Sequence, residues 1–246
     1  MKTDFKKYRL PVLAAILGSA AGVLRAALLL LGTDEKGLLI PGHPLDILVW
    51  VITAAAILGV AALVRKLDGS QQYDHNFAPS GAACLGCFAL AAAIAVTTLT
   101  GLGGFAKLDR IRDICGLLAI PAALWAGICR RKGTRPFFLF HAAVCLYLTL
   151  YAISRYQSWS SLPQLQDYVF SVLASCLLPL FGYYQTAFDV DMGNRRMQLG
   201  TGLLAAFFCI TALAGATDPV LYLGGAIWTL TNLCSLNPRD DDHAAA

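Results

Sequence analysis

Apolar residues occur along this chain in blocks of about 20, the length that crosses the hydrocarbon core of a bilayer as a helix. Short polar segments separate the blocks. The blocks lie at residues 10–31, 45–64, 81–103, 111–129, 136–153, 161–191, 197–213 and 219–236. This pattern predicts an all-α, polytopic membrane protein, a bundle of about eight transmembrane helices in four hairpins.

Composition supports the same class. Charged residues make up 14% of the 246 residues and hydrophobic residues 57%, whereas soluble domains carry about 25% charged residues. We expect a single transmembrane domain over residues 1–238 and a polar tail over 239–246. Lipid is therefore the expected surrounding of most of the surface.

The basic residues predict an orientation. With eight spans, thirteen of the nineteen basic residues fall on one side of the membrane and five on the other, and Arg25 lies within a span. The positive-inside rule then places both termini in the cytoplasm, in a cell inner (plasma) membrane. The basic loops are ordinary topology signals, so we expect no nucleic-acid partner.

Prolines and glycines mark particular helices. Pro121 and Pro179 interrupt the fourth and sixth blocks, and interrupted helices often form the binding sites of transporters. Kinks without such a role are also frequent in membrane helices. Gly18 and Gly22 have a small-xxx-small spacing, which lets a second helix approach closely.

Arg25 is the most unusual residue of the spans. A guanidinium within a span is costly, by roughly 2.5 to 3.5 kcal/mol on insertion scales. It could anchor an anion or carboxylate that enters from the outer face. Alternatively, it extends to the lipid head groups, or it pairs with an acidic residue of a nearby segment (Asp34, Glu35 or Asp167).

Other polar residues could line a cavity between the fifth and sixth spans. His141 and Tyr147 lie in the fifth span, and Tyr184 and Gln185 lie near the end of the sixth. His141 could act as a proton relay or ligand, or could hydrogen-bond a neighbouring helix. The tyrosines could instead belong to an interfacial aromatic belt, which suits Tyr184 better than the mid-span Tyr147.

The cysteines and histidines predict no metal site and no cofactor. All eight cysteines lie within or at the ends of apolar blocks, which favours packing over a disulfide framework. Cys84 and Cys87 form a CxxC that could be a redox pair or half a zinc site, but there is no second CxxC. There is no HExxH, P-loop or GxGxxG motif.

Three segments carry a resemblance. TDEKGLL (33–39), RYQSWSSLPQLQDY (155–168) and AFDVDMGNRR (187–196) resemble segments of a group of uncharacterised bacterial multi-pass inner-membrane proteins. This resemblance implies a bacterial inner membrane and no particular activity or functional residue.

These observations favour a small transporter or small-molecule-binding membrane protein, with Arg25, His141, Tyr147, Tyr184 and Gln185 as ligand-binding residues. Its site would lie between the interrupted fourth and sixth spans, near Arg25. The alternative is a non-catalytic sensor, scaffold or partner subunit of a membrane complex, which would associate with its own copies or with another membrane subunit. An enzyme that acts on lipid with His141 as the base is the third hypothesis.

Overall fold

The computed structural model describes residues 2–33, 39–40, 42–65, 70–101, 107–160 and 168–237. Three acidic residues considered above as partners of Arg25, namely Asp34, Glu35 and Asp167, lie outside these residues, as does the expected tail over 239–246. Within the described residues the chain is helical and has no β-strand.

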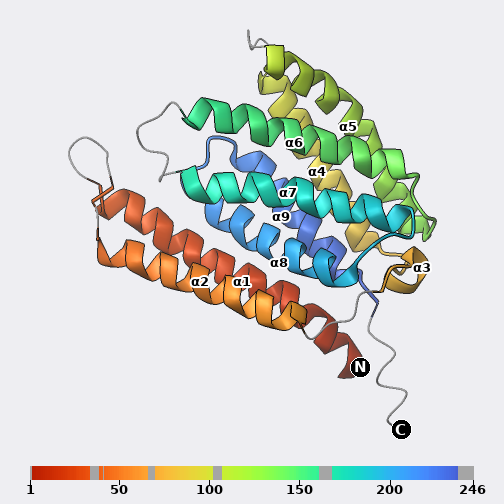
Figure 1. Ribbon diagram of the computed structural model, residues 1–246, viewed down its shortest axis with the longest axis horizontal. Coiled ribbons are helices and arrows are strands. Elements are labelled where there is room, and N and C mark those ends of the chain that lie inside the picture. Colours follow the sequence, from red (N-terminus) through yellow and green to blue (C-terminus); the bar gives the residue numbers. More distant parts are fainter. Residues whose placement is uncertain are drawn as a thin grey trace.

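Nine helices make up the described part of the chain (Figure 1). They are α1 (Lys2–Leu31), α2 (Pro44–Arg65), α3 (Tyr73–Asn76), α4 (Gly81–Gly101), α5 (Lys107–Lys132), α6 (Phe138–Ser160), α7 (Val169–Asp189), α8 (Arg195–Ala212) and α9 (Pro219–Cys234). The short α3 was not expected, because its residues lie in a polar linker without helical periodicity. Pro11, Pro121 and Pro179 lie inside α1, α5 and α7, which continue past them.

Six of these helices are long and apolar enough to cross a membrane: Arg9–Leu31 of α1, then α2, α4, α5, α6 and α7. The chain thus has the helices of a multi-pass membrane protein. The last two helices lie where the seventh and eighth spans were expected, but they have only 18 and 16 residues. The count of eight spans in four hairpins therefore remains a prediction.

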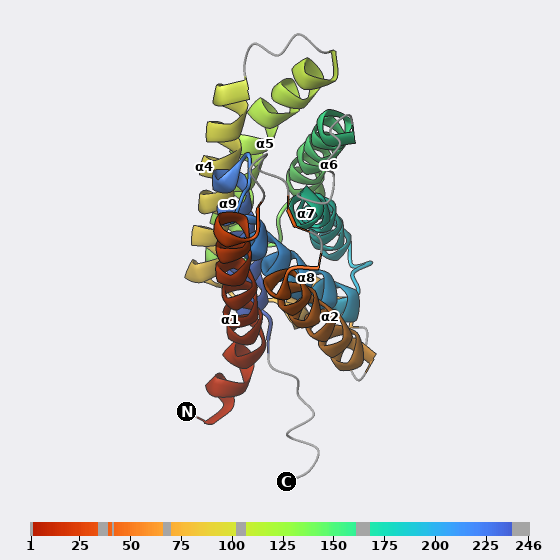
Figure 2. The same ribbon diagram turned by 90° about the vertical axis from the view of Figure 1, so that its left-hand side faces the viewer.

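The two short helices, α8 and α9, occupy the centre of the bundle. In Figures 1 and 2 they lie between the α1–α2 pair and the group formed by α4, α5 and α6. α9 packs on α4 and α8, and α8 also packs on α1 and α7. α2 is the least covered of the six long helices, with 17% of its most apolar window buried.

Small residues allow the central helices to approach their neighbours closely. A Cβ atom on Gly224 of α9 would lie 2.5 Å from the Cβ of Ala93 on α4. A Cβ on Gly86 of α4 would lie 1.9 Å from Oγ1 of Thr231 on α9. Each helix therefore needs its own glycine where it meets the other.

The small-xxx-small spacing in α1 marks a close helix contact, as predicted. A Cβ atom on Gly18 would lie 3.1 Å from the backbone oxygen of Phe207 in α8, and one on Gly22 would lie 3.3 Å from that of Ile210. Thr211 of α8 donates its hydroxyl to the Gly18 backbone oxygen at 3.4 Å. This contact attaches the α1–α2 pair to the centre of the bundle.

One end of the bundle, here called the α3 end, is closed by a buried arginine. Arg130, near the end of α5, is 1% exposed. It donates to the Tyr73 hydroxyl at 3.1 Å and to the Ser235 hydroxyl, and its guanidinium lies 4.1 Å from the centre of the Phe77 ring. Together these contacts join α3, α5 and the end of α9.

Asp191, which follows α7, fastens α3 from the other side. Its carboxylate accepts the Tyr73 backbone N–H at 2.9 Å and pairs with Arg135 at 2.7 Å. These contacts lower the pKa of Asp191 below its ordinary value, the Tyr73 N–H being the main cause. The α3 end is thus stabilised by the charged form of the Asp191 carboxylate.

Candidate functional site

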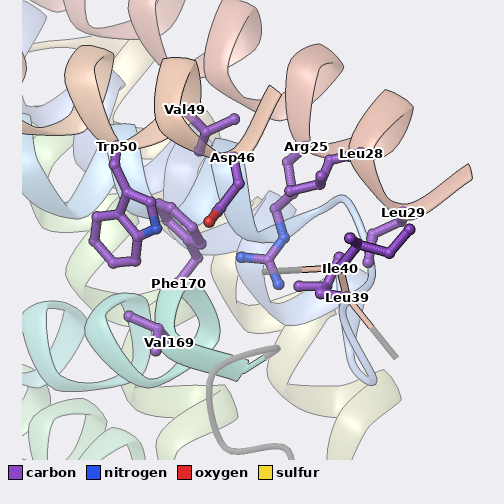
Figure 3. Close-up of a pocket in the computed structure, with 10 residues that line it drawn as sticks. All are labelled: Arg25, Leu28, Leu29, Leu39, Ile40, Asp46, Val49, Trp50, Val169 and Phe170. Carbon is purple, nitrogen blue, oxygen red and sulfur yellow. The ribbon is translucent and has the colours of Figure 1, made fainter. Parts of the chain in front are cut away.

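A pocket of about 320 Å³ lies between α1, α2 and α7 (Figure 3). It is at the end of the bundle away from α3, here called the opposite end, where α1 ends and α2 and α7 begin. Its lining residues are Arg25, Leu28 and Leu29 from α1, Leu39 and Ile40, Asp46, Val49 and Trp50 from α2, and Val169 and Phe170 from α7. We call it the Arg25 pocket.

Arg25 supplies the cation of this pocket. It lies six residues before the last residue of α1, Leu31, so it is about 9 Å below the end of that helix. The side chain is 5% exposed, and its guanidinium carbon lies 4.6 Å from the centre of the Phe170 ring. The face of an aromatic ring attracts a cation at this distance, most strongly where water is excluded.

Two residues of α2 complete the polar and aromatic walls. Asp46 and Trp50 are four residues apart, so they lie on the same face of the helix. Figure 3 shows the Asp46 carboxylate and the Arg25 guanidinium pointing toward one another. Trp50 packs against Phe170 of α7 with the ring centres 5.4 Å apart.

This arrangement has the composition of a binding site for a small molecule. A cavity of this size is at the lower end of the range for small-molecule sites, which combine apolar walls with a few placed polar groups. The described lining residues include a guanidinium and a carboxylate, and they include no serine, cysteine, histidine or lysine. A ligand could therefore be held here by charge, hydrogen bonds and ring contacts.

His141 is placed elsewhere, near the α3 end. Its Nδ1 lies 2.6 Å from a carboxylate oxygen of Asp189 on α7, and both side chains are almost completely buried. The Cys87 thiol of α4 is close enough to His141 to interact with it. Neither pocket described here includes this Cys–His–Asp group, so the geometry favours a role in joining three helices.

The other three predicted ligand-binding residues are also not among the described lining residues of the Arg25 pocket. Tyr147 is fully buried in α6, with its ring centre 6.4 Å from that of Tyr151. Tyr184 is partly buried and packs edge-on against Tyr183. Gln185 is 1% exposed, one turn before Asp189 on α7. Of the five residues predicted to bind a ligand, only Arg25 lines the Arg25 pocket.

The predicted site lay between the two interrupted spans, and the described lining residues of the Arg25 pocket come from one of them. The interrupted sixth span, α7, lines the Arg25 pocket, but the interrupted fourth span, α5, does not. Asp46, Trp50 and Phe170 were not expected as site residues. An aspartate near a helix start and aromatic residues near the membrane interface are ordinary features of membrane helices. Only the fold shows that these three residues surround Arg25.

A second pocket, of about 420 Å³, lies across the opposite end of the bundle, between α4, α5, α6 and the start of α9. It contains Arg112 and Arg155, and both guanidiniums have carboxylate partners. Arg112 bonds to Asp113 at 2.8 Å and Asp109 at 3.1 Å, and Arg155 pairs with Asp218. Two cations thus face three carboxylates, which makes this pocket poorly suited to an anion.

Most of the cysteines are buried or partly buried in the helices. All eight cysteines lie in described residues and are free thiols, and Cys84, Cys87 and Cys209 are buried. Cys176 differs from expectation, because it is exposed on the surface of α7. Among the described residues, no group of three or more His, Cys, Asp or Glu side chains could hold a metal ion.

Comparisons of the chain with protein families, with curated proteins and with solved structures found no match. The Arg25 pocket is therefore the feature that indicates a function.

Proposed function

We propose that this chain is a multi-pass membrane protein that binds a small ligand with an acidic group in the Arg25 pocket. The observation that supports this proposal is the placement of Arg25. Its side chain is 5% exposed inside a membrane-crossing helix and lines a cavity of about 320 Å³. Ionisable residues within a membrane span are costly and commonly mark a ligand pathway.

The residue types indicate the chemistry of the ligand. A guanidinium offers a planar set of donors that matches a carboxylate or phosphate, and such bonds are strongest where water is excluded. Asp46 adds one negative charge to the lining, so the described lining residues carry no net charge. A ligand that brings both an acidic group and a hydrogen-bond donor would satisfy Arg25 and Asp46 together.

A transporter would require a route from this pocket to the other end of the bundle. The α3 end is closed by the contacts of Arg130, so transport would need these to open. The alternative function, a scaffold or partner subunit, is favoured by one observation. The His141–Asp189 pair is buried and joins α6 to α7, as a purely structural pair would.

The Arg25→Gln variant tests the binding proposal. We expect native mass spectrometry of the purified protein to detect a bound acidic molecule, and we expect this variant to lose it. The matched control is Arg135→Gln, because Arg135 is a partly exposed arginine at the α3 end, far from the pocket. Identical bound molecules in the wild type and in Arg25→Gln, or none in either, would contradict the proposal.

A further inference from the structure

The Arg25 pocket has the depth of a lipid head group. Arg25 lies about 9 Å below the end of α1, and Asp46 lies in the first turn of α2 at the same end of the bundle. The head-group layers add about 5 to 8 Å to each side of the hydrocarbon core. If α1 spans the bilayer, the guanidinium therefore lies close to the boundary between head groups and acyl chains.

The volume of the pocket also fits a head group better than a whole lipid. A cavity of 320 Å³ holds about ten groups of the size of a water molecule. The pocket therefore has room for a glycerol phosphate group, which has about ten non-hydrogen atoms, but not for a whole phospholipid. The acyl chains of such a ligand would have to lie outside the pocket.

The outer wall of the pocket offers an apolar surface for those chains. Trp50 lines the pocket and is also 43% exposed. Its neighbours on α2, Ile47 and Val51, are exposed as well, on the helix that the bundle covers least. In a bilayer this surface contacts acyl chains, and a tryptophan at this level is typical of the membrane interface.

We propose that the ligand of the Arg25 pocket is an acidic phospholipid whose head group also carries a hydroxyl. This inference rests on the proposed function. The phosphate accepts hydrogen bonds from Arg25, the head-group hydroxyl donates to Asp46, and the acyl chains extend along α2 past Trp50. A water-soluble acid would use the same polar groups but would gain nothing from the exposed apolar wall.

Quenching of Trp50 fluorescence by brominated lipids tests this proposal. The chain has four tryptophans, and Trp125 is also exposed, so the protein carries Trp125→Phe in every sample. It is placed in phosphatidylcholine vesicles with a small fraction of brominated phosphatidylglycerol or of brominated phosphatidylcholine. The attraction between one arginine and acidic lipid is about 1 kcal/mol, which corresponds to about a fivefold preference. We therefore expect brominated phosphatidylglycerol to occupy the position next to Trp50 about five times as often as brominated phosphatidylcholine at the same fraction.

Arg25→Gln should reduce quenching by the acidic lipid to the level seen with brominated phosphatidylcholine. Vesicles made mainly of brominated phosphatidylcholine should quench both proteins equally, which shows that the variant is folded with Trp50 in the bilayer. Equal quenching of the unsubstituted Arg25 protein by the two lipids at low fraction would overturn the lipid proposal.

A second experiment distinguishes a phospholipid from a water-soluble phosphate ester as the ligand. Thermal unfolding in detergent is measured with phosphatidylglycerol and with glycerol 3-phosphate, and we expect only the lipid to raise the melting temperature. Stabilisation by glycerol 3-phosphate that depends on Arg25, without excess quenching, would overturn the lipid proposal and leave the proposed function intact. No ligand in either experiment and no bound acid in the mass spectra would overturn both.

Discussion

Four basic side chains, three arginines and one histidine, are buried within the described helices, and each has a different environment. Arg112 bonds to two carboxylates, and Arg130 bonds to hydroxyls and lies over a ring. His141 pairs with Asp189, whereas Arg25 lies over Phe170 in a pocket. Only the environment of Arg25 includes a described space in which a further molecule could meet the charge and an aromatic ring.

The His141–Asp189 pair should be important for stability. Replacing one partner by leucine leaves the other polar group buried alone, which costs about 3 to 5 kcal/mol in the free energy of unfolding. The double variant His141→Leu with Asp189→Leu should lose much less than the sum of the two single changes. Denaturant unfolding in mixed micelles measures all three.

The comparison for this cycle is Arg135→Gln, which removes the partly exposed pair with Asp191 and a hydrogen bond to the Asp189 backbone oxygen but leaves the Asp189 side chain in place. Such pairs contribute about 1 kcal/mol or less. Additive losses in the His141–Asp189 double variant would show that the two side chains are not coupled.

Individual residues also show how far the sequence could predict the site. Arg25 was recognised because a charge inside an apolar run is a local signal. Phe170 and Asp46 gave no such signal, because an aromatic or acidic residue near a helix end is common in membrane proteins. They lie near Arg25 because helices that are far apart in the sequence pack together. A single sequence carries no signal for which distant helices are in contact.

Among the elements, α1 depends on small residues where it meets the backbone of α8. Gly18→Val should destabilise the protein by about 1 to 3 kcal/mol, because the new side chain would overlap the α8 backbone. Gly59→Val in α2 is the matched control, since a Cβ there meets no atom within 4 Å. Valine forms helices slightly better than glycine, so this control should be neutral or mildly stabilising. Equal loss in both variants would show that the α1–α8 contact is unimportant.

Elements were predicted well where an apolar block ends in a run of charged or turn-forming residues. The end of α1 at Leu31 matches the expected span, and α2 and α4 begin within a residue of theirs. The prediction failed for α3, because four residues carry no periodic signal and this helix is held by tertiary contacts with Arg130 and Asp191.

At the scale of the whole molecule, the position of α8 and α9 decides the topology. Helices of 18 and 16 residues are about 27 and 24 Å long, slightly shorter than the hydrocarbon core of about 30 Å. Both are surrounded by other helices, so neighbouring protein and not lipid contacts most of their surface. We therefore expect them to cross the membrane in spite of their length.

Labelling of a single new cysteine tests this topology. The turn between α8 and α9 lies at the opposite end of the bundle, next to the end of α4, and Thr217 within it is exposed. In intact cells, a membrane-impermeant maleimide should label Thr217→Cys but not Thr134→Cys, which lies at the α3 end. The parent protein reports any labelling of native cysteines. Labelling of both positions only after permeabilisation would show that α8 and α9 do not cross, whereas labelling of Thr134→Cys alone in intact cells would reverse the predicted orientation.

The contact between Gly18 and Thr211 has a consequence for biosynthesis. The two residues are 193 positions apart, and ribosomes add about 5 to 20 residues per second. The first helix therefore leaves the ribosome roughly 10 to 40 seconds before its partner exists. During this interval the glycine face of α1 contacts lipid or an insertion chaperone in place of α8. Assembly of the bundle is therefore completed only when the C-terminal half has been made.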